Sequence, residues 1–178
     1  TNFNAMFHSM SGITTIDVSN IDTSNATNLS AMFASCANLK SIDLSKFDTS
    51  KVTNMSSMFE YCVELTNIDL SSFDTSKVTD MGRTFKNTSN LTEIIFGEHF
   101  NTSNVTTMLE MFLGSNIKEI DLSKFDTSNV INMDGMFRQC NFSKLDLSNF
   151  NTSKLKSAKL MFQRNGNIDV IDLSNADF

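Results

Sequence analysis

Apolar and polar residues of this chain follow a pattern that recurs every 25 to 27 residues. A Met-Phe pair, with Thr in place of Met in one copy, marks the period. The Phe of this pair occupies positions Phe7, Phe33, Phe59, Phe85, Phe112, Phe137 and Phe162. Self-similarity at a period of this length is typical of repeat proteins, in which each unit buries its apolar side against its neighbours. The chain therefore contains seven repeat units.

One unit, residues 39–64, combines two periods. Ile42 to Ser45 alternate apolar and polar, which predicts a half-buried strand. From Val52 to Cys62 apolar residues recur at spacings of three and four, which predicts a short helix or 3₁₀ turn. The part from Val52 to Met55 is equally compatible with a second short strand.

These patterns predict an α/β solenoid. We expect a right-handed stack with a parallel β-sheet on one face and short helices or 3₁₀ turns on the other. The single repeat domain spans residues 1–178, and both ends fall within a unit, which predicts a segment of a longer array. The repeat Phe residues, together with Phe47, Phe73, Phe100, Phe125 and Phe150, are expected to form core ladders.

Composition narrows the classes of function. The chain has 24 Ser, 18 Thr and 21 Asn, a net charge of −6 and 16 Phe. The negative charge argues against nucleic-acid binding, the lack of a long apolar run against membrane insertion, and the Phe content against disorder. No catalytic triad, Gly-rich phosphate loop or metal-ligand spacing stands out, so we expect no enzyme activity, no cofactor and no metal.

A specific string recurs along the chain. Residues 39–44 and 65–70 read Leu-x-x-Ile-Asp-Leu, and residues 47–59 read Phe-Asp-Thr-Ser-Lys-Val-Thr-Asn-Met-Ser-Ser-Met-Phe. This string resembles the repeat of BspA-like leucine-rich-repeat bacterial surface proteins, also found in mycoplasma-type lipoproteins. The resemblance implies an extracellular or cell-surface module for adhesion to host or matrix proteins, without a shared catalytic site. It also implies that a signal peptide and an anchor lie outside this segment.

The main candidate site is the residue between the two inward positions of each predicted strand. This column consists of Asp17, Asp43, Asp69, Ile95, Asp121, Asp146 and Asp172. If the flanking apolar residues point inward, these side chains point outward and form an acidic stripe. Neighbouring carboxylates about 5 Å apart repel by about 3 kcal/mol at an effective dielectric near 20. The stripe is interpreted as a recognition surface for a basic protein, as a solubilising column bonded to nearby Ser residues, or as a cation site.

Two further positions carry weaker signals. Asp interchanges with Asn in one column, which favours a role in capping turns. This column consists of Asp22, Asp48, Asp74, Asn101, Asp126 and Asn151.

In the fourth unit Ile95 breaks the acidic stripe. An exposed apolar residue with a polar rim is typical of a binding hot spot, although ordinary drift between repeats explains it as well.

The cysteines occupy one repeat position. Cys36, Cys62 and Cys140 each lie three residues after the repeat Phe, where other units have Met, Thr, Ser or Asn. This interchange predicts a tightly packed small side chain and free thiols. Cys36 and Cys62 lie in adjacent units, so a bridge between them is the alternative.

The function that the sequence favours is a non-enzymatic surface module that binds a protein or extracellular-matrix partner. One alternative is a structural spacer that binds nothing itself. Another is binding to a repetitive surface, such as glycan or ice, through the Thr-Ser rows.

Overall fold

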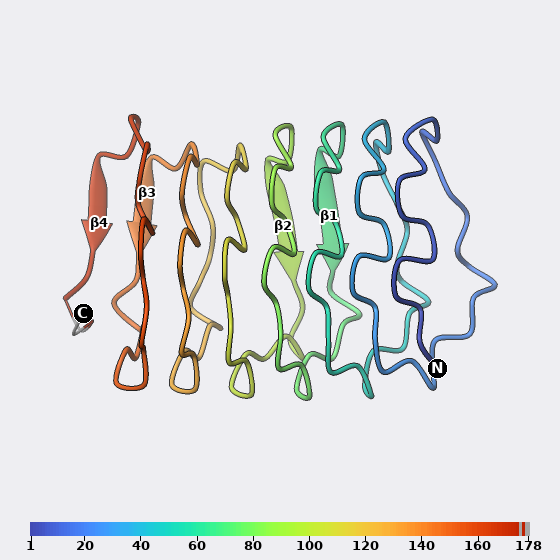
Figure 1. The fold of residues 1–178 in the computed structure, drawn as a ribbon, viewed down its shortest axis with the longest axis horizontal. Coiled ribbons are helices and arrows are strands. Elements are labelled where there is room, and N and C mark those ends of the chain that lie inside the picture. Colours follow the sequence, from blue (N-terminus) through green and yellow to red (C-terminus); the bar gives the residue numbers. More distant parts are fainter. Residues whose placement is uncertain (175, 177–178) are drawn as a thin grey trace.

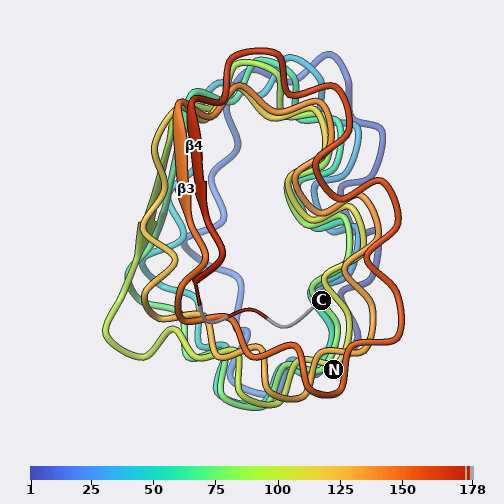
Figure 2. The ribbon, with the colours of Figure 1, turned by 90° about the vertical axis from the view of Figure 1, so that its left-hand side faces the viewer.

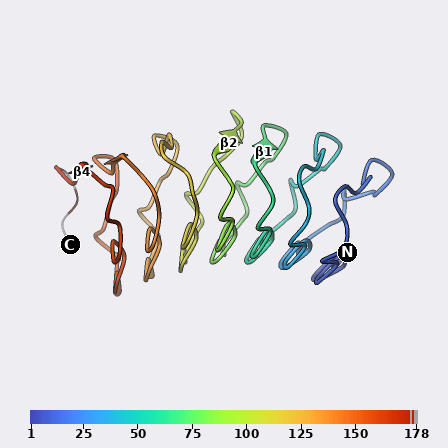
Figure 3. The ribbon, with the colours of Figure 1, turned by 90° about the horizontal axis from the view of Figure 1, so that it is seen from above.

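In the computed structural model, which describes residues 1–174 and 176, the repeat units stack in chain order (Figure 1). Viewed along the stack, the units follow a common outline (Figure 2), and from above they lie in single file (Figure 3). Phe178, the predicted end of the domain, lies outside the described residues. Contacts between units are therefore contacts between residues about 26 positions apart.

The predicted α/β class is wrong. The described residues contain no helix and four short strands: β1 (Asn67–Leu70), β2 (Glu93–Phe96), β3 (Lys144–Asp146) and β4 (Val170–Asp172). β1 pairs in parallel with β2, and β3 with β4, as two separate two-stranded sheets. The equivalent triplets 16–18, 42–44 and 120–122 form no strand, so no continuous sheet covers this face.

In β1, β2 and β3 the predicted alternation is confirmed, whereas at β4 Asp172 is partly buried and the following Leu173 is exposed. In β1, Ile68 and Leu70 are buried, whereas Asn67 and Asp69 are exposed. Gly97, directly after β2, brings its backbone so close to the Ser71 carbonyl that a Cβ atom would collide with it. The absence of a side chain at Gly97 thus allows the chains to approach closely beside the β1–β2 pair.

The segment predicted to be helical is a ribbon of consecutive turns. In one unit, Met55 N–H donates to the Asp80 carbonyl of the next unit (3.0 Å), whereas Met58 N–H donates to the Met55 carbonyl (3.3 Å). This alternation continues along the segment, with four donors reaching the next unit at every junction from the first unit to the seventh. An α-helix uses its interior N–H groups within one segment, so the two arrangements exclude one another.

Residues with a positive φ set this turn ribbon. They occur in pairs four residues apart in every unit. The pairs are Ala5 and Ser9, Ala31 and Ser35, Ser57 and Tyr61, Arg83 and Asn87, Glu110 and Gly114, Gly135 and Gln139, and Leu160 and Arg164. A left-handed residue cannot continue a right-handed helix.

The second strand considered as an alternative over Val52 to Met55 does not form. A single residue of this segment makes β-bridges. Asn54 forms isolated parallel bridges to Asn28 and Asp80, and no strand extends from it. Thr53 N–H donates to the Thr27 carbonyl of the preceding unit (2.9 Å). The backbone here therefore joins its unit to both neighbours.

The Phe ladders form the core, as predicted. The seven rings of the Met-Phe position stack with centroids 5.5–6.1 Å apart and interplanar angles of 3–9°. The five rings of this ladder from Phe33 to Phe137 are buried, as are Phe47, Phe73, Phe100, Phe125 and Phe150. Phe7 and Phe162, in the first and last units, are partly buried.

Buried threonines join the units at the turns that follow Phe47 and its equivalents in the other units. Thr49 Oγ1 donates to the Asp74 carbonyl (2.9 Å) and accepts from Asp74 N–H (2.9 Å), so one hydroxyl satisfies two backbone groups of the next unit. Thr75 and Thr127 make the same pair of bonds to Asn101 and Asn151.

The cysteine position is a hydrogen-bond donor. Cys62 Sγ lies 3.1 Å from the carbonyl oxygen of Phe33 in the preceding unit, and Cys140 Sγ lies 3.0 Å from that of Phe112. Asn165 Nδ2 donates to the Phe137 carbonyl in the same way (2.7 Å), which explains how Asn can replace Cys at this position. All three cysteines are free and buried, and burial raises the pKa of Cys62 to about 12 and that of Cys140 to about 11.

Phe85→Ala should destabilise the stack far more than Phe7→Ala. Phe85 is fully enclosed between two ring neighbours, so its truncation leaves a cavity and should cost about 3 to 5 kcal/mol. Phe7 is partly exposed and stacks on one ring only. Urea unfolding followed by circular dichroism measures both, and equal losses would contradict a stack held by this ladder.

Gly135→Ala tests the turn ribbon. Gly135 has a φ of 60°, and a Cβ atom there would meet Glu110 Cγ at 3.3 Å. The substitution should therefore lower the free energy of unfolding by about 1 kcal/mol or more. Gly12→Ala is the control, because Gly12 lies outside the left-handed region with no atom within 4 Å of the added Cβ. A neutral Gly135→Ala would argue against the left-handed turn.

Candidate functional site

The predicted acidic column lies on the surface. Asp17, Asp43, Asp69, Asp121 and Asp146 are exposed, and Asp172 is partly exposed. The parallel registers place Asp69 beside Ile95 and Asp146 beside Asp172. The other members lie in extended segments without strand pairing. Within each of the two sheets, the structure thus places two successive members of the column side by side.

Each carboxylate of this column caps its own turn. Asp43 Oδ1 accepts the N–H of Ser45, two residues later, at 2.9 Å. The same bond, at 2.8–3.0 Å, joins Asp17 to Ser19, Asp69 to Ser71, Asp121 to Ser123, Asp146 to Ser148 and Asp172 to Ser174. The side chains are therefore held in a repeated local geometry, with the second carboxylate oxygen not engaged by this bond.

These bonds also favour the charged form. The backbone N–H and hydroxyl of the following Ser lower the pKa of Asp17 and Asp43 below the ordinary value of 3.8. For Asp121 and Asp146 the Ser hydroxyl is the larger cause and the Ser N–H the second. These four carboxylates are thus ionised at neutral pH.

The second column, from Asp22 to Asn151, has the capping role that the Asp-Asn interchange predicted. Asp48 Oδ1 accepts from Ser50 N–H at 3.0 Å, and Asn101 Oδ1 accepts from Ser103 N–H at 2.7 Å. The amide oxygen and the carboxylate therefore serve the same turn. Replacing Asp with Asn at this position consequently keeps the hydrogen bond that caps the turn.

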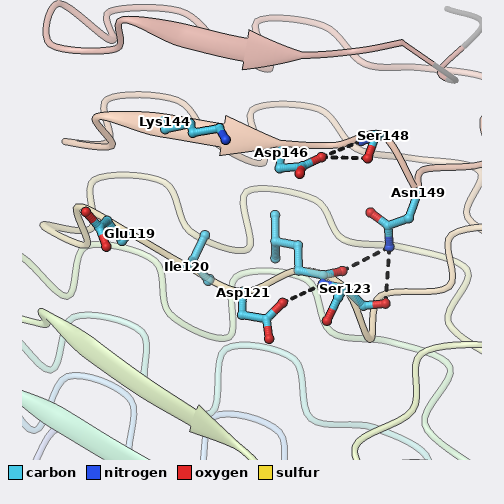
Figure 4. Close-up of a pocket in the computed structure, with 9 residues that line it drawn as sticks. Glu119, Ile120, Asp121, Ser123, Lys144, Asp146, Ser148 and Asn149 are labelled. Atoms are coloured by element: carbon cyan, nitrogen blue, oxygen red, sulfur yellow. Dashed lines mark hydrogen bonds between the residues drawn. The ribbon is translucent and has the colours of Figure 1, made fainter.

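A depression of about 500 Å³ joins two members of the acidic column (Figure 4). Asp121 and Asp146 line it together with Glu119 and Lys144. A hydrogen bond joins its two walls, because Asn149 Nδ2 donates to the Leu122 carbonyl at 3.0 Å. Sequence reasoning missed Glu119, although it lies two residues before Asp121 and so on the same side of an extended chain.

A charged cluster on the outer side of the turn ribbon was also missed. Lys86 Nζ lies 2.9 Å from Glu110 Oε2 and 3.4 Å from Glu60 Oε1, and Arg83 Nε lies 3.0 Å from Glu110 Oε2. These residues are 24–27 positions apart and occupy adjacent units. The repeat period therefore provides the signal that could have found them.

Searches for two other kinds of site gave no candidate. Within residues 1–174 and 176, no group of His, Cys, Asp and Glu side chains is arranged to hold a metal ion. In the same described part of the chain, no helix is long and apolar enough to cross a membrane.

Comparison with known proteins identifies the family. The sequence profile described as "Mycoplasma protein of unknown function, DUF285" matches residues 1–97 and 92–177. The chain belongs to the DUF285 family. Among solved structures, this DUF285 chain matches the functional domain of InlJ from Listeria monocytogenes, which includes a cysteine ladder, at 15% identity. The match covers 81% of this chain and 45% of InlJ, with a TM-score of 0.20, too low to support an argument about the fold. No curated protein matches.

The capped carboxylates predict acid sensitivity. The pKa values of Asp22, Asp48 and Asp126 in the folded state lie below the ordinary value of 3.8. Their contribution to the free energy of unfolding is therefore full above that pH and is lost as the pH falls through the folded-state pKa values. The midpoint of thermal unfolding should change little from pH 7 to pH 5 and fall below about pH 4. Circular dichroism melts across this range measure it.

The matched variant is Asp22→Asn with Asp48→Asn and Asp126→Asn, since Asn caps the turn without titrating. Its midpoint should fall less steeply below about pH 4. A wild-type midpoint that rises on acidification would contradict the capping role.

Proposed function

We propose that the chain is a non-enzymatic cell-surface module that binds a protein or extracellular-matrix partner through its acidic column. The observation that carries this proposal is an exposed column of carboxylates whose orientation is maintained by the following Ser, which at Asp17, Asp43 and Asp121 also favours the charged form. A basic partner would meet a surface that is already ordered and ionised. Preordered side chains reduce the entropy cost of binding.

Ile95 adds an apolar contact to this surface. Its side chain is 45% exposed, and the β1–β2 register places it beside Asp69. An apolar side chain bordered by charged groups is the arrangement in which interface hot spots occur. The proposed contact surface therefore includes Ile95 as well as the six Asp residues.

A finer assignment rests on the resemblance of the repeat string to BspA-like leucine-rich-repeat surface proteins. We propose on this ground that the module acts outside the cell, in adhesion. Membership in DUF285 is compatible with this assignment and leaves the partner open.

A structural spacer is the second candidate function. Each carboxylate of the acidic column already satisfies a backbone N–H of its own turn, so the column has a structural role without any partner. A spacer would retain these caps while binding no host component.

The triple variant Asp43→Asn, Asp69→Asn, Asp121→Asn separates the two candidates. Asn should keep the turn bonds, as Asn101 and Asn151 do, while three charges are removed. We expect its affinity for immobilised matrix proteins or host cells to fall by about tenfold or more. Surface plasmon resonance and cell adhesion assays measure this change.

The matched control is Asp22→Asn, Asp48→Asn, Asp126→Asn, which removes the same charge from the other capping column. Its affinity should remain within about twofold of wild type. Unchanged binding of the first variant would remove the acidic column from the interface. A wild-type chain that binds no matrix protein or cell would favour the spacer.

A further inference from the structure

The last two units carry a positive surface that contrasts with the net charge of −6. Residues 147–168 include Lys154, Lys156, Lys159 and Arg164 but no Asp or Glu. All four cationic residues are exposed. The charge therefore reverses locally at this end of the stack.

Two cations of the fourth unit have acidic partners on the turn ribbon, whereas those of the last unit have none among the described residues. Arg83 and Lys86 form ion pairs with Glu110. In the part of the chain that the structure describes, no carboxylate lies within 4.0 Å of the charged groups of the four cations. Asp134 borders the surface, but its Oδ1 accepts from the backbone N–H of Lys159 at 2.6 Å.

Arg138 of the sixth unit provides an independent observation. Its Nε is buried and has no hydrogen-bond partner among the described residues. Residues 135–139 run beside 159–163, because Gly135 N–H donates to Lys159 (2.8 Å) and Gln139 N–H to Gln163 (2.9 Å). A buried guanidinium N–H without an acceptor is costly, and an anion bound here would offset that cost.

We propose that this basic surface, formed by Arg138, Lys154, Lys156, Lys159 and Arg164, binds an anionic polysaccharide. Lys156 and Lys159 are three residues apart, at most about 10 Å along the chain. Several cations can therefore meet successive anionic groups of one polymer. The neighbouring exposed residues Ser153 and Gln163 supply a hydroxyl and an amide group that suit sugar hydroxyls.

The surroundings favour a polysaccharide over two other polyanions. Residues 151–168 contain no exposed aromatic side chain on which a nucleic-acid base could stack. Leu160 is the one exposed apolar side chain in the fully described segment 154–164, which is too little for insertion into a lipid surface.

Binding of the full chain to heparin, which carries sulfate groups, and to alginate, which carries carboxylates, tests the proposal. The variant Lys156→Gln, Lys159→Gln, Arg164→Gln should bind both at least about tenfold more weakly at low salt. The slope of log K against log salt concentration should shrink by roughly 2 to 3, nearly one for each lost cation. Isothermal titration calorimetry over a series of NaCl concentrations measures both effects.

The matched control, Lys40→Gln, Lys46→Gln, Lys77→Gln, removes equal charge from exposed sites elsewhere. Binding by this control should stay within about twofold of wild type, and Lys156→Arg with Lys159→Arg should retain wild-type binding. Melting temperatures check folding, and the single variant Lys156→Gln replaces the triple variant if the latter is unfolded. Equal losses in the control, no binding by wild type, or tighter binding to an oligonucleotide or to phosphatidylserine vesicles would overturn the proposal.

Discussion

Hydrogen bonding between successive units along the turn ribbon is the interaction on which the rest of this structure depends. Alternate N–H groups donate to the next unit, while those between them close turns within their own unit. This division satisfies the backbone of the segment without a helix. It also sets the spacing at which the Phe rings stack, 5.5–6.1 Å between centroids. The core and the backbone bonds thus share one repeat distance.

Much of the polar content follows from this constraint. The buried Thr hydroxyls bridge backbone groups between units, the Cys position donates to a Phe carbonyl, and the Asp and Asn columns cap turns. A chain with many turns needs many short side chains that bond to the backbone. Most Ser, Thr and Asn residues therefore carry little direct information about function.

The distribution of charged side chains on the surface is the main indication of function. The outer carboxylates remain exposed and ionised although they cap turns, whereas the cations of the last unit lie without carboxylate partners among the described residues. One chain therefore presents an acidic face and a basic surface. The net charge of −6, read alone, conceals the second.

The sequence by itself determined the period, the number of units, the core Phe ladders and the outward direction of the acidic column. Each follows from periodicity, because identical positions in stacked units share one environment. Only the tertiary structure decided the backbone of the segment from Val52 to Cys62. A spacing of three and four fits both a helix and a run of turns, and the choice depends on whether N–H groups bond locally or to a neighbour. Arg138 was likewise beyond the pattern, since the lack of a partner for its Nε among the described residues depends on neighbours about 25 positions away.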